Sequence, residues 1–230
     1  MNGVRKKGTI WALIPVKDFG SAKSRLRTVL SPDECAGLAK NMVRDVAAAT
    51  TDSDIVDGLS LLGSGPDIEK LADELHCDCM EEFYDVDLSC NLGLAARQLD
   101  THGVATLIII PGDLPTLRAR DIDQVITRTD SDLGVCTAGL DGGTNALVLT
   151  PPGALAFQFG KHSARRHLEA GEAAGLSTVD IGHPAFRVDI DTADDLIWLC
   201  KQAISGHTAN FLDHTGIRKK ILDAEAAVPA

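Results

Sequence analysis

Short apolar runs alternate along the chain with longer segments in which apolar residues recur every three or four positions. The runs are typical of buried strands, and the longer segments are typical of helices with one apolar face. The predicted strands cover residues 10–14, 55–62, 77–82, 104–110, 133–137, 146–149, 177–181 and 186–190. The predicted helices cover residues 32–50, 67–76, 92–99, 163–174 and 194–204, with one more that begins near residue 119. Strands that alternate with helices predict an α/β fold with a mostly parallel central sheet flanked by helices.

The first helix has the clearest start signal. Ser31 fits the N-cap position, Pro32 fits the first helical position, and Glu34 completes a capping box. The helix is predicted to bury an apolar stripe that consists of Leu38, Met42, Val43 and Val46. The chain has no internal repeat and no low-complexity linker. We therefore predict a single domain over residues 1–230, in which residues 207–230 form a C-terminal tail.

A cluster of cations follows the first predicted strand. Lys17, Lys23 and Arg25 lie within nine residues of each other, and Gly20, Ser21 and Ala22 separate them. Small residues let a backbone wrap closely around a ligand, and clustered cations on such a loop suit a polyphosphate. The alternative is a solvated loop between a strand and a helix with incidental charges.

An acidic residue follows the most apolar strand. Residues 104–110 carry one polar side chain, Thr106, which indicates a central strand with both faces buried. Asp113 comes directly after it, between Gly112 and Pro115. Ligands of open α/β sheets bind at the carboxyl ends of strands, and a carboxylate there suits Mg²⁺. Alternatively, Asp113 hydrogen-bonds its own turn.

A second acidic site follows the last predicted strand. Asp189 and Asp191 alternate with apolar residues, so both point to one side of the strand end. One of them could meet Asp113 and complete a magnesium site. Asp191 or Thr192 could instead cap the next helix. We therefore favour Asp189 as the metal ligand and keep Asp191 as the second choice.

Two glycine-containing segments suit an acidic acceptor substrate. Asp141 and two glycines precede Thr144 and Asn145, although Asp-Gly is also a common hairpin turn. Gly160 and Ser163 lead into a helix N-terminus, which attracts anions unless it is only a capped and solvated helix start. Further hydrogen-bond donors nearby are His162, Arg165, Arg166 and His167.

Composition excludes several classes of protein. The net charge of −11 argues against a general nucleic-acid or acidic-membrane binder, and 4% aromatic residues argue against base-stacking platforms. The six cysteines form no C-x-x-C pair, and neither a secretory signal nor a stretch of about 18 apolar residues occurs. We expect reduced core thiols in a cytoplasmic protein.

In this order and spacing, the segments resemble the guanylyltransferases of coenzyme F-420 biosynthesis from Ile14 to about Ile217. The pieces that match are Ile14-Pro15-Val16-Lys17, Ala22-Lys23-Ser24-Arg25-Leu26, Pro111-Gly112-Asp113-Leu114-Pro115, Gly143-Thr144-Asn145-Ala146, Phe159-Gly160 with Ser163, and Asp189-Ile190-Asp191-Thr192. This family transfers GMP from GTP to 2-phospho-L-lactate, phosphoenolpyruvate or 3-phospho-D-glycerate and releases pyrophosphate. The fold that the resemblance implies is the nucleotide-diphospho-sugar transferase (GT-A) type of α/β domain, and the assembly it suggests is a homodimer.

The resemblance also implies roles for individual residues. Lys17, Lys23 and Arg25 would hold the GTP phosphates, and Asp113 with Asp189 or Asp191 would hold Mg²⁺. Thr144, Gly160 and Ser163 would hold the acceptor acid. Asn91 matches the nucleoside-contacting segment of the family, although the usual Gly-Leu-Asn is Ser89-Cys90-Asn91 here.

Two other functions compete with this interpretation. One is a nucleotidyltransferase of the same fold that acts on a sugar phosphate or a molybdopterin. Such enzymes usually open with a loop that contains Gly-Gly, whereas this chain has Pro15-Val16-Lys17. The other is a non-catalytic nucleotide-binding domain, which would not need two separate carboxylate sites.

Overall fold

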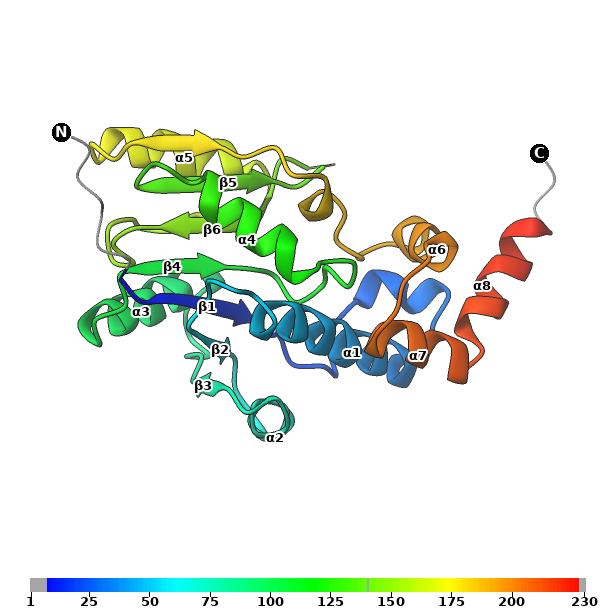
Figure 1. Cartoon of the computed structure of the whole chain (residues 1–230). Helices are drawn as coiled ribbons and strands as arrows, with labels where there is room; N and C mark the ends of the chain where they lie inside the picture. The colour runs from blue at the N-terminus through cyan, green and yellow to red at the C-terminus, as the bar shows by residue number, and fades with distance from the viewer. Residues whose placement is uncertain (1–7, 140, 228–230) are drawn as a thin grey trace.

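A central sheet with helices on both faces forms the larger part of the molecule, and a group of helices lies beyond one end of its strands (Figure 1). The structure is a computed structural model, and it describes residues 8–139 and 141–227. Within these residues, seven strands form one sheet in the order β3-β2-β1-β4-β6-β5-β7. β6 runs antiparallel to β4 and β5, and the other neighbours pair in parallel, so the predicted mostly parallel sheet is confirmed. The strands are β1 (Ile10–Pro15), β2 (Gly58–Leu62), β3 (Asp78–Met80), β4 (Thr106–Ile109), β5 (Leu133–Thr137), β6 (Thr144–Leu149) and β7 (Thr178–Asp180).

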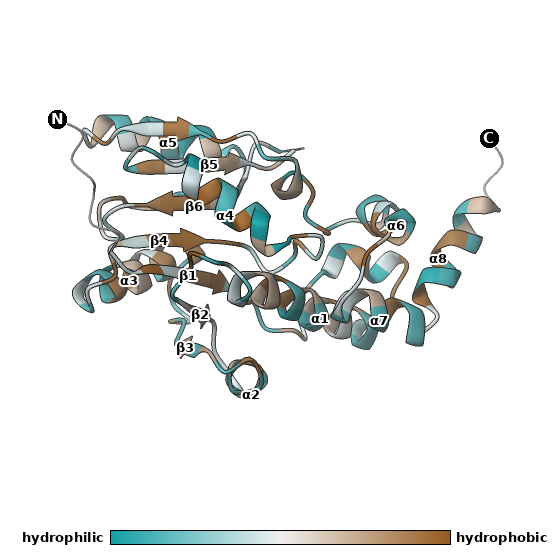
Figure 2. Cartoon of the chain, viewed as in Figure 1, coloured by the Kyte–Doolittle hydropathy of each residue, from teal (hydrophilic) through white to brown (hydrophobic). Residues whose placement is uncertain are grey.

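Helices cover both faces of the sheet, and a further group of helices packs beyond the carboxyl ends of its parallel strands. They are α1 (Pro32–Thr51), α2 (Pro66–Leu75), α3 (Leu88–Thr101), α4 (Ala119–Arg128), α5 (Ser163–Ala173), α6 (Ala193–Lys201), α7 (His207–His214) and α8 (Ile217–Ala226), with the short 3-10 helices η1 (Ser24–Thr28) and η2 (Pro184–Phe186). One apolar cluster joins the sheet to α1, α2 and α4, and another joins it to α3 and α5. A third cluster packs η1, α1, α6, α7 and α8 together beyond the carboxyl ends of the parallel strands. Figure 2 shows the matching pattern, with hydrophobic strands inside and polar outer helix faces.

The start and the apolar face of α1 agree with the sequence. Ser31 Oγ accepts a hydrogen bond from the Glu34 amide at 3.2 Å, and Glu34 Oε2 accepts one from the Ser31 amide at 2.7 Å. The predicted stripe is buried: Val43 and Val46 pack toward the sheet, whereas Leu38 and Met42 belong to the helical cluster. Burial of each such side chain stabilises the fold by roughly 1.5–3 kcal/mol. α1 therefore connects the sheet to the helical extension.

The predicted strand over residues 186–190 is wrong. The 3-10 helix η2 occupies its start, and the rest runs along the end of the sheet without pairing as a strand. Phe186 and Ile190 are both fully buried, but in different apolar clusters. Their alternation therefore reflects two separate cores rather than one sheet face. The Ile190 amide donates to the Asp113 carbonyl at 3.1 Å, which brings this segment against the loop after β4.

The tail after residue 206 is helical where the structure describes it. α7 packs on α1, and α8 packs on α6 and α7. Asp45 fixes the start of α7, because its carboxylate accepts hydrogen bonds from the amides of His207 at 2.7 Å and Thr208 at 2.8 Å. None of the helices in the described part of the chain is long and apolar enough to cross a membrane.

The cysteines are only partly core residues. All six are free, and Cys35, Cys136 and Cys200 are buried. Burial raises the pKa of Cys136 to about 12, so this thiol stays protonated. Cys79 and Cys90 are exposed. The prediction of core thiols is therefore confirmed for three cysteines and wrong for these two.

Candidate active site

A cavity of about 440 Å³ opens at the carboxyl edge of the sheet, where β1, β2 and β4 end. Its walls come from the loop after β1, the loop after β4, the middle of α1 and the loop after β3. The polar side chains in its lining are Lys17, Ser21, Lys23, Ser24, Arg25, Glu82, Asp113 and Asp191. This size and position are typical of a small-molecule site in an α/β protein.

Lys23 lies at the centre of the polar part of the cavity. Its Nζ donates to Asp113 Oδ2 at 2.6 Å and to Asp191 Oδ1 at 2.9 Å, and its side chain is 9% exposed. Burial alone would lower the pKa of Lys23, but the two carboxylates outweigh it and raise this pKa above its usual value. Lys23 therefore carries its charge inside the cavity.

The backbone at Lys23 is strained in a way that places this side chain. Its φ of 54° lies in the left-handed region, where a side chain costs roughly 1–2 kcal/mol. Such residues persist only where the surrounding contacts hold them, and they are frequent at functional sites. The two ion pairs supply those contacts here.

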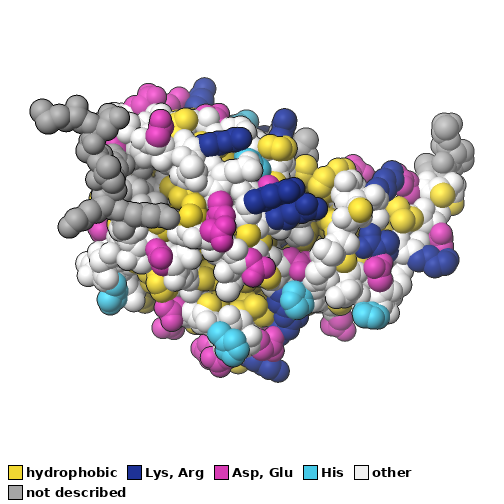
Figure 3. All heavy atoms as spheres, viewed as in Figure 1, with side chains coloured by type: hydrophobic (Ala, Val, Ile, Leu, Met, Phe, Trp, Pro, Cys, Tyr) yellow, Lys and Arg dark blue, Asp and Glu magenta, His cyan; other side chains and the backbone are white. Residues whose placement is uncertain are grey.

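The other two predicted cations lie at the rim. Arg25 approaches Asp191 at 3.4 Å but remains 73% exposed, and Lys17 is also exposed. Burial would raise the pKa of Asp191, but Lys23 and Arg25 hold it below its usual value. The predicted phosphate loop thus brings one buried and two accessible cations to one cavity. Figure 3 shows that basic and acidic side chains are interspersed on the face of the molecule seen in Figure 1.

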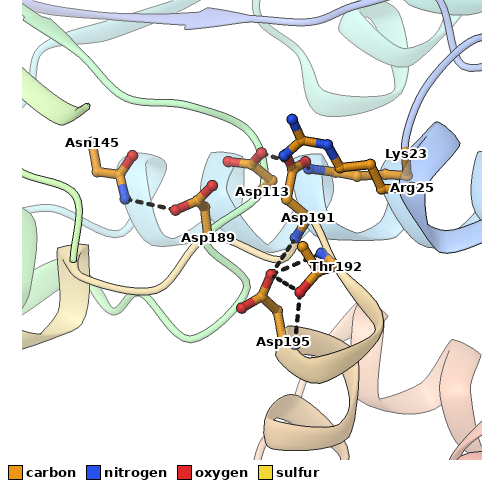
Figure 4. Close-up of polar contacts among 8 residues, drawn as sticks. All are labelled: Lys23, Arg25, Asp113, Asn145, Asp189, Asp191, Thr192 and Asp195. Atoms are coloured by element: carbon orange, nitrogen blue, oxygen red, sulfur yellow. Dashed lines mark hydrogen bonds and ion pairs between the residues drawn. The ribbon is translucent and has the colours of Figure 1, made fainter. Parts of the chain in front are cut away.

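Asp113 and Asp189 lie close together on the other side of the site (Figure 4). Burial raises the pKa of Asp189, and the negative charge of Asp113 raises it further. Asn145 partly offsets this by donating to Asp189 Oδ1 at 3.2 Å. Asp113 Oδ2 is paired with Lys23, whereas its Oδ1 is buried and has no hydrogen-bond partner among the described residues.

This carboxylate pair fits a hard cation. A buried carboxylate oxygen without a donor is costly, so it marks a place where a positive group belongs. Among the described residues, no three His, Cys, Asp or Glu side chains are grouped as a metal site. Two carboxylates completed by phosphates and water are nevertheless the usual protein environment of Mg²⁺. Asp189 faces the Asp113 carboxylate, whereas Asp191 is already occupied by Lys23 and Arg25.

The helix-capping alternative holds for Thr192. Its hydroxyl accepts from the Asp195 amide at 3.3 Å and caps α6. Asp195 Oδ2 in turn accepts from the amides of Thr192 at 2.7 Å and Asp191 at 3.1 Å. The cap therefore fixes the backbone of Asp191 and leaves its carboxylate directed at the cations (Figure 4).

The predicted acceptor residues form a second polar cluster at the start of β6 and α5. Thr144 Oγ1 lies 2.8 Å from Ser163 Oγ and 3.1 Å from His167 Nδ1. Burial lowers the pKa of His167 to about 4, so the ring is neutral near pH 7. Because its Nε2 accepts from the Gln158 amide at 2.8 Å, its Nδ1 carries the proton and donates to Thr144. His167 thus orients the hydroxyl pair.

Access to this second cluster is limited. Thr144 is 7% exposed, and Ser163 is fully buried. Gly160 has a φ of 118°, which only glycine adopts without strain, and its carbonyl accepts from the Ser163 amide at 3.0 Å. The first amide of α5 is therefore already bonded, and the hydroxyl of Thr144 contacts Ser163 and His167. Asn145, the next residue along β6, donates instead to Asp189 Oδ1, because consecutive side chains of a strand point to opposite faces.

Asn91 does not line the cavity in the described part of the chain. It is buried, and its amide accepts from the Phe83 amide at 2.9 Å and donates to the Phe83 carbonyl at 3.1 Å and to Glu82 Oε1 at 3.3 Å. Its contact with a nucleoside stays a prediction, since its side chain is occupied with the loop after β3. Glu82 of that loop does line the cavity, and sequence reasoning missed it. The signal was available, since Glu82 ends a predicted strand as Asp113 follows one.

The chain is similar to known guanylyltransferases. The family model described as guanylyl transferase, CofC like, matches residues 10–227. A phosphoenolpyruvate guanylyltransferase of Roseiflexus sp. (strain RS-1) is 32% identical over 194 residues, which cover 84% of this chain and 86% of that protein. A 2-phospho-L-lactate guanylyltransferase of Methanothermobacter thermautotrophicus is 30% identical over 205 residues, which cover 87% and 88%.

A solved structure confirms the fold. A crystal structure from Desulfovibrio desulfuricans G20, described as a nucleotide-diphospho-sugar transferase, superposes with a TM-score of 0.78. The match covers 93% of this chain and 97% of the other, at 19% identity. The predicted nucleotide-diphospho-sugar transferase fold is therefore confirmed.

Proposed function

This chain belongs to the CofC-like guanylyltransferase family, and we propose that it transfers GMP from GTP to phosphoenolpyruvate, 2-phospho-L-lactate or 3-phospho-D-glycerate, with release of pyrophosphate, in coenzyme F-420 biosynthesis. The observation that carries the proposal is the buried Lys23 between Asp113 and Asp191 at the carboxyl edge of the sheet. A cavity in which cations and carboxylates lie side by side suits a nucleoside triphosphate and its metal ion.

The GTP phosphates bind to Lys17, Lys23 and Arg25. The Lys23 ammonium has three N–H donors, and Asp113 and Asp191 use two of them. The third can reach a phosphate oxygen, while Lys17 and Arg25 at the rim neutralise the outer phosphates. These cations also stabilise the pyrophosphate as it leaves.

Asp113 and Asp189 hold Mg²⁺, with Asp191 as the second choice. The unpartnered Asp113 Oδ1 and the raised pKa of Asp189, which comes from burial and the Asp113 charge, support this choice. When bound, Mg²⁺ neutralises charge on the phosphates and orients them for displacement.

The acceptor acid binds at Thr144, Gly160 and Ser163. An oxygen of its phosphate group is already an anion, so it attacks the α-phosphorus of GTP without a general base. The described residues that line the cavity include neither histidine nor cysteine, which agrees with direct in-line transfer. The protein then has to position the two anions and neutralise their charge. The proposal also includes a cytoplasmic location, which the composition predicts, and a homodimer, which the family resemblance implies.

The test is pyrophosphate release from GTP with each of the three acids in turn, with and without Mg²⁺. We expect release with at least one acid, dependent on Mg²⁺, together with a nucleotide-linked acid product. Release with a sugar phosphate or a molybdopterin instead would support the competing nucleotidyltransferase function. Absence of release with every acceptor, in a protein that binds GTP, would favour a non-catalytic nucleotide-binding domain. Sedimentation analysis of the same preparation tests the homodimer.

A further inference from the structure

The cavity extends beyond the cations toward β2 and β3. Asp113 follows β4, Lys17 follows β1, Leu62 ends β2, and Glu82 lies two residues past β3. These four strands are consecutive neighbours in the sheet, so the distance from β4 to β3 is three strand spacings, or roughly 14 Å. With the phosphates above β4 and β1, as proposed above, the ribose and base of the nucleotide extend toward β2 and β3.

Glu82 is the carboxylate at this far end. The other two acids in the described lining, Asp113 and Asp191, are paired with Lys23, whereas no described cation pairs with Glu82. Glu82 Oε1 accepts a long hydrogen bond from Asn91, and no partner within the described residues occupies Oε2. The carboxylate therefore has free acceptor capacity toward the cavity.

The loop around Glu82 is held firmly in place. Ser64 Oγ donates to the Glu82 carbonyl at 2.7 Å and accepts from the Glu82 amide at 3.1 Å. Asn91 holds the next residue, Phe83, through both of its backbone groups. Leu62 and Leu88 add apolar surface to the lining near Glu82. Apolar walls with one fixed polar group are typical of a site that orients a flat ligand.

We propose that Glu82 selects guanine by accepting hydrogen bonds from its N1–H and 2-amino groups. A carboxylate only accepts hydrogen bonds, and these two adjacent donors match its two oxygens. Adenine presents a nitrogen lone pair at N1, which a carboxylate repels, and hypoxanthine keeps N1–H but lacks the 2-amino group. Asn91 then acts as a positioning residue for Glu82, which gives the predicted nucleoside-contacting residue an indirect role. The inference rests on the proposed placement of GTP in this cavity.

The test compares GTP with inosine triphosphate, which carries hypoxanthine, in wild type and Glu82→Gln. We expect wild type to prefer GTP about tenfold or more, since a hydrogen bond to a charged group is lost with inosine triphosphate. Glu82→Gln should lower kcat/KM for GTP roughly tenfold to a hundredfold, mainly through KM, and bring the GTP preference close to unity. The acceptor KM should not change.

The matched control is Glu81→Gln, because Glu81 is exposed on the same loop, lies outside the described cavity lining and loses the same charge. It should behave as wild type. The ratio of the two nucleotides is measured in one preparation, so it does not depend on the folded fraction. Glu82→Asp, which keeps the charge but withdraws it, should shift the ratio in the same direction by a smaller factor.

Several results would overturn the inference. An unchanged GTP preference in Glu82→Gln, or an equal loss with both nucleotides, would leave Glu82 with a structural role only. Lys17→Ala separates this failure from a failure of the proposed GTP site. If Lys17→Ala raises the GTP KM and Glu82→Gln does not, the phosphates bind as proposed and Glu82 does not read the base. If neither variant affects GTP, the nucleotide binds elsewhere.

Discussion

Asp113→Asn perturbs the centre of the site with almost no change of shape. The replaced carboxylate accepts from Lys23 at 2.6 Å through Oδ2, and its Oδ1 is buried without a partner in the part of the chain that the structure describes. Loss of one partner from a buried ion pair costs about 3–5 kcal/mol, and from an exposed pair about 0–1 kcal/mol. Asp113 is 24% exposed, Lys23 keeps Asp191 at 2.9 Å, and repulsion of Asp189 is relieved. We therefore expect the free energy of unfolding to fall by only about 1–2 kcal/mol.

Activity should fall much further than stability in this variant. Even the loss of a group behind a metal ligand costs about 10–100-fold, so kcat should drop at least tenfold at saturating GTP. The assay is pyrophosphate release across a Mg²⁺ titration, with unfolding by denaturant as the check on folding. Asp194→Asn is the control, because Asp194 is exposed in the first turn of α6 and loses the same charge. Near-normal turnover of folded Asp113→Asn at saturating Mg²⁺ would refute the metal role, and an equal loss in Asp194→Asn would reduce it to net charge.

Three further predictions concern the other parts of the site. Lys17→Ala and Lys23→Ala should raise the KM for GTP more than the KM for the acceptor, about tenfold at the buried Lys23 and less at the exposed Lys17. Steady-state kinetics with each substrate varied in turn measures both constants, and an unchanged GTP KM in both variants would contradict the phosphate role of these lysines. Thr144→Val keeps the shape of the side chain but leaves Ser163 and His167 without their partner. It should weaken acceptor binding by about 1–3 kcal/mol, which raises the acceptor KM, while GTP binding stays intact. Unaltered acceptor kinetics would show that the acceptor binds elsewhere. Burial lowers the pKa of His167 from 6.5 to about 4, so between these values the unfolded chain binds a proton that the native protein does not, and stability falls as pH falls. At pH 5 the free energy of unfolding is lower by about 2 kcal/mol for this reason. Denaturant unfolding at pH 7 and pH 5 measures the difference, and His167→Asn should remove it. Equal losses of stability in wild type and variant would contradict a neutral buried ring.

The parts of the fold that sequence predicts well depend on local signals. α1 begins at Ser31 because the cap and its Glu34 partner lie three residues apart, and its apolar stripe repeats at helical spacing. The strands of the sheet centre are likewise continuous apolar runs, and β5 has the predicted ends. Such interactions span only a few residues, so the sequence contains both partners.

Residues 186–190 show where that reasoning fails. Period-two alternation reports that alternate side chains are buried, but it does not report what buries them. Phe186 enters the core beneath the sheet and Ile190 enters the helical cluster, which exists because the tail folds into α7 and α8. No signal near residue 190 identifies these long-range partners, so the pattern predicts a strand where the chain forms an extended connection.

The same limit separates the predicted from the unpredicted parts of the site. Asp113 and Lys23 follow strands, and the ends of parallel strands meet at one edge of a sheet, so topology alone places them together. What each group does there depends on contacts that the topology does not specify. Lys23 could have faced solvent, but a left-handed backbone turns it into the cavity between two carboxylates. Glu82 follows the same strand-end rule, yet it becomes a candidate for reading the base only because Ser64 and Asn91, each at least nine residues away, fix its loop at the cavity. The local sequence therefore predicts which residues lie at the ends of the strands, whereas tertiary packing determines which side chains they contact there.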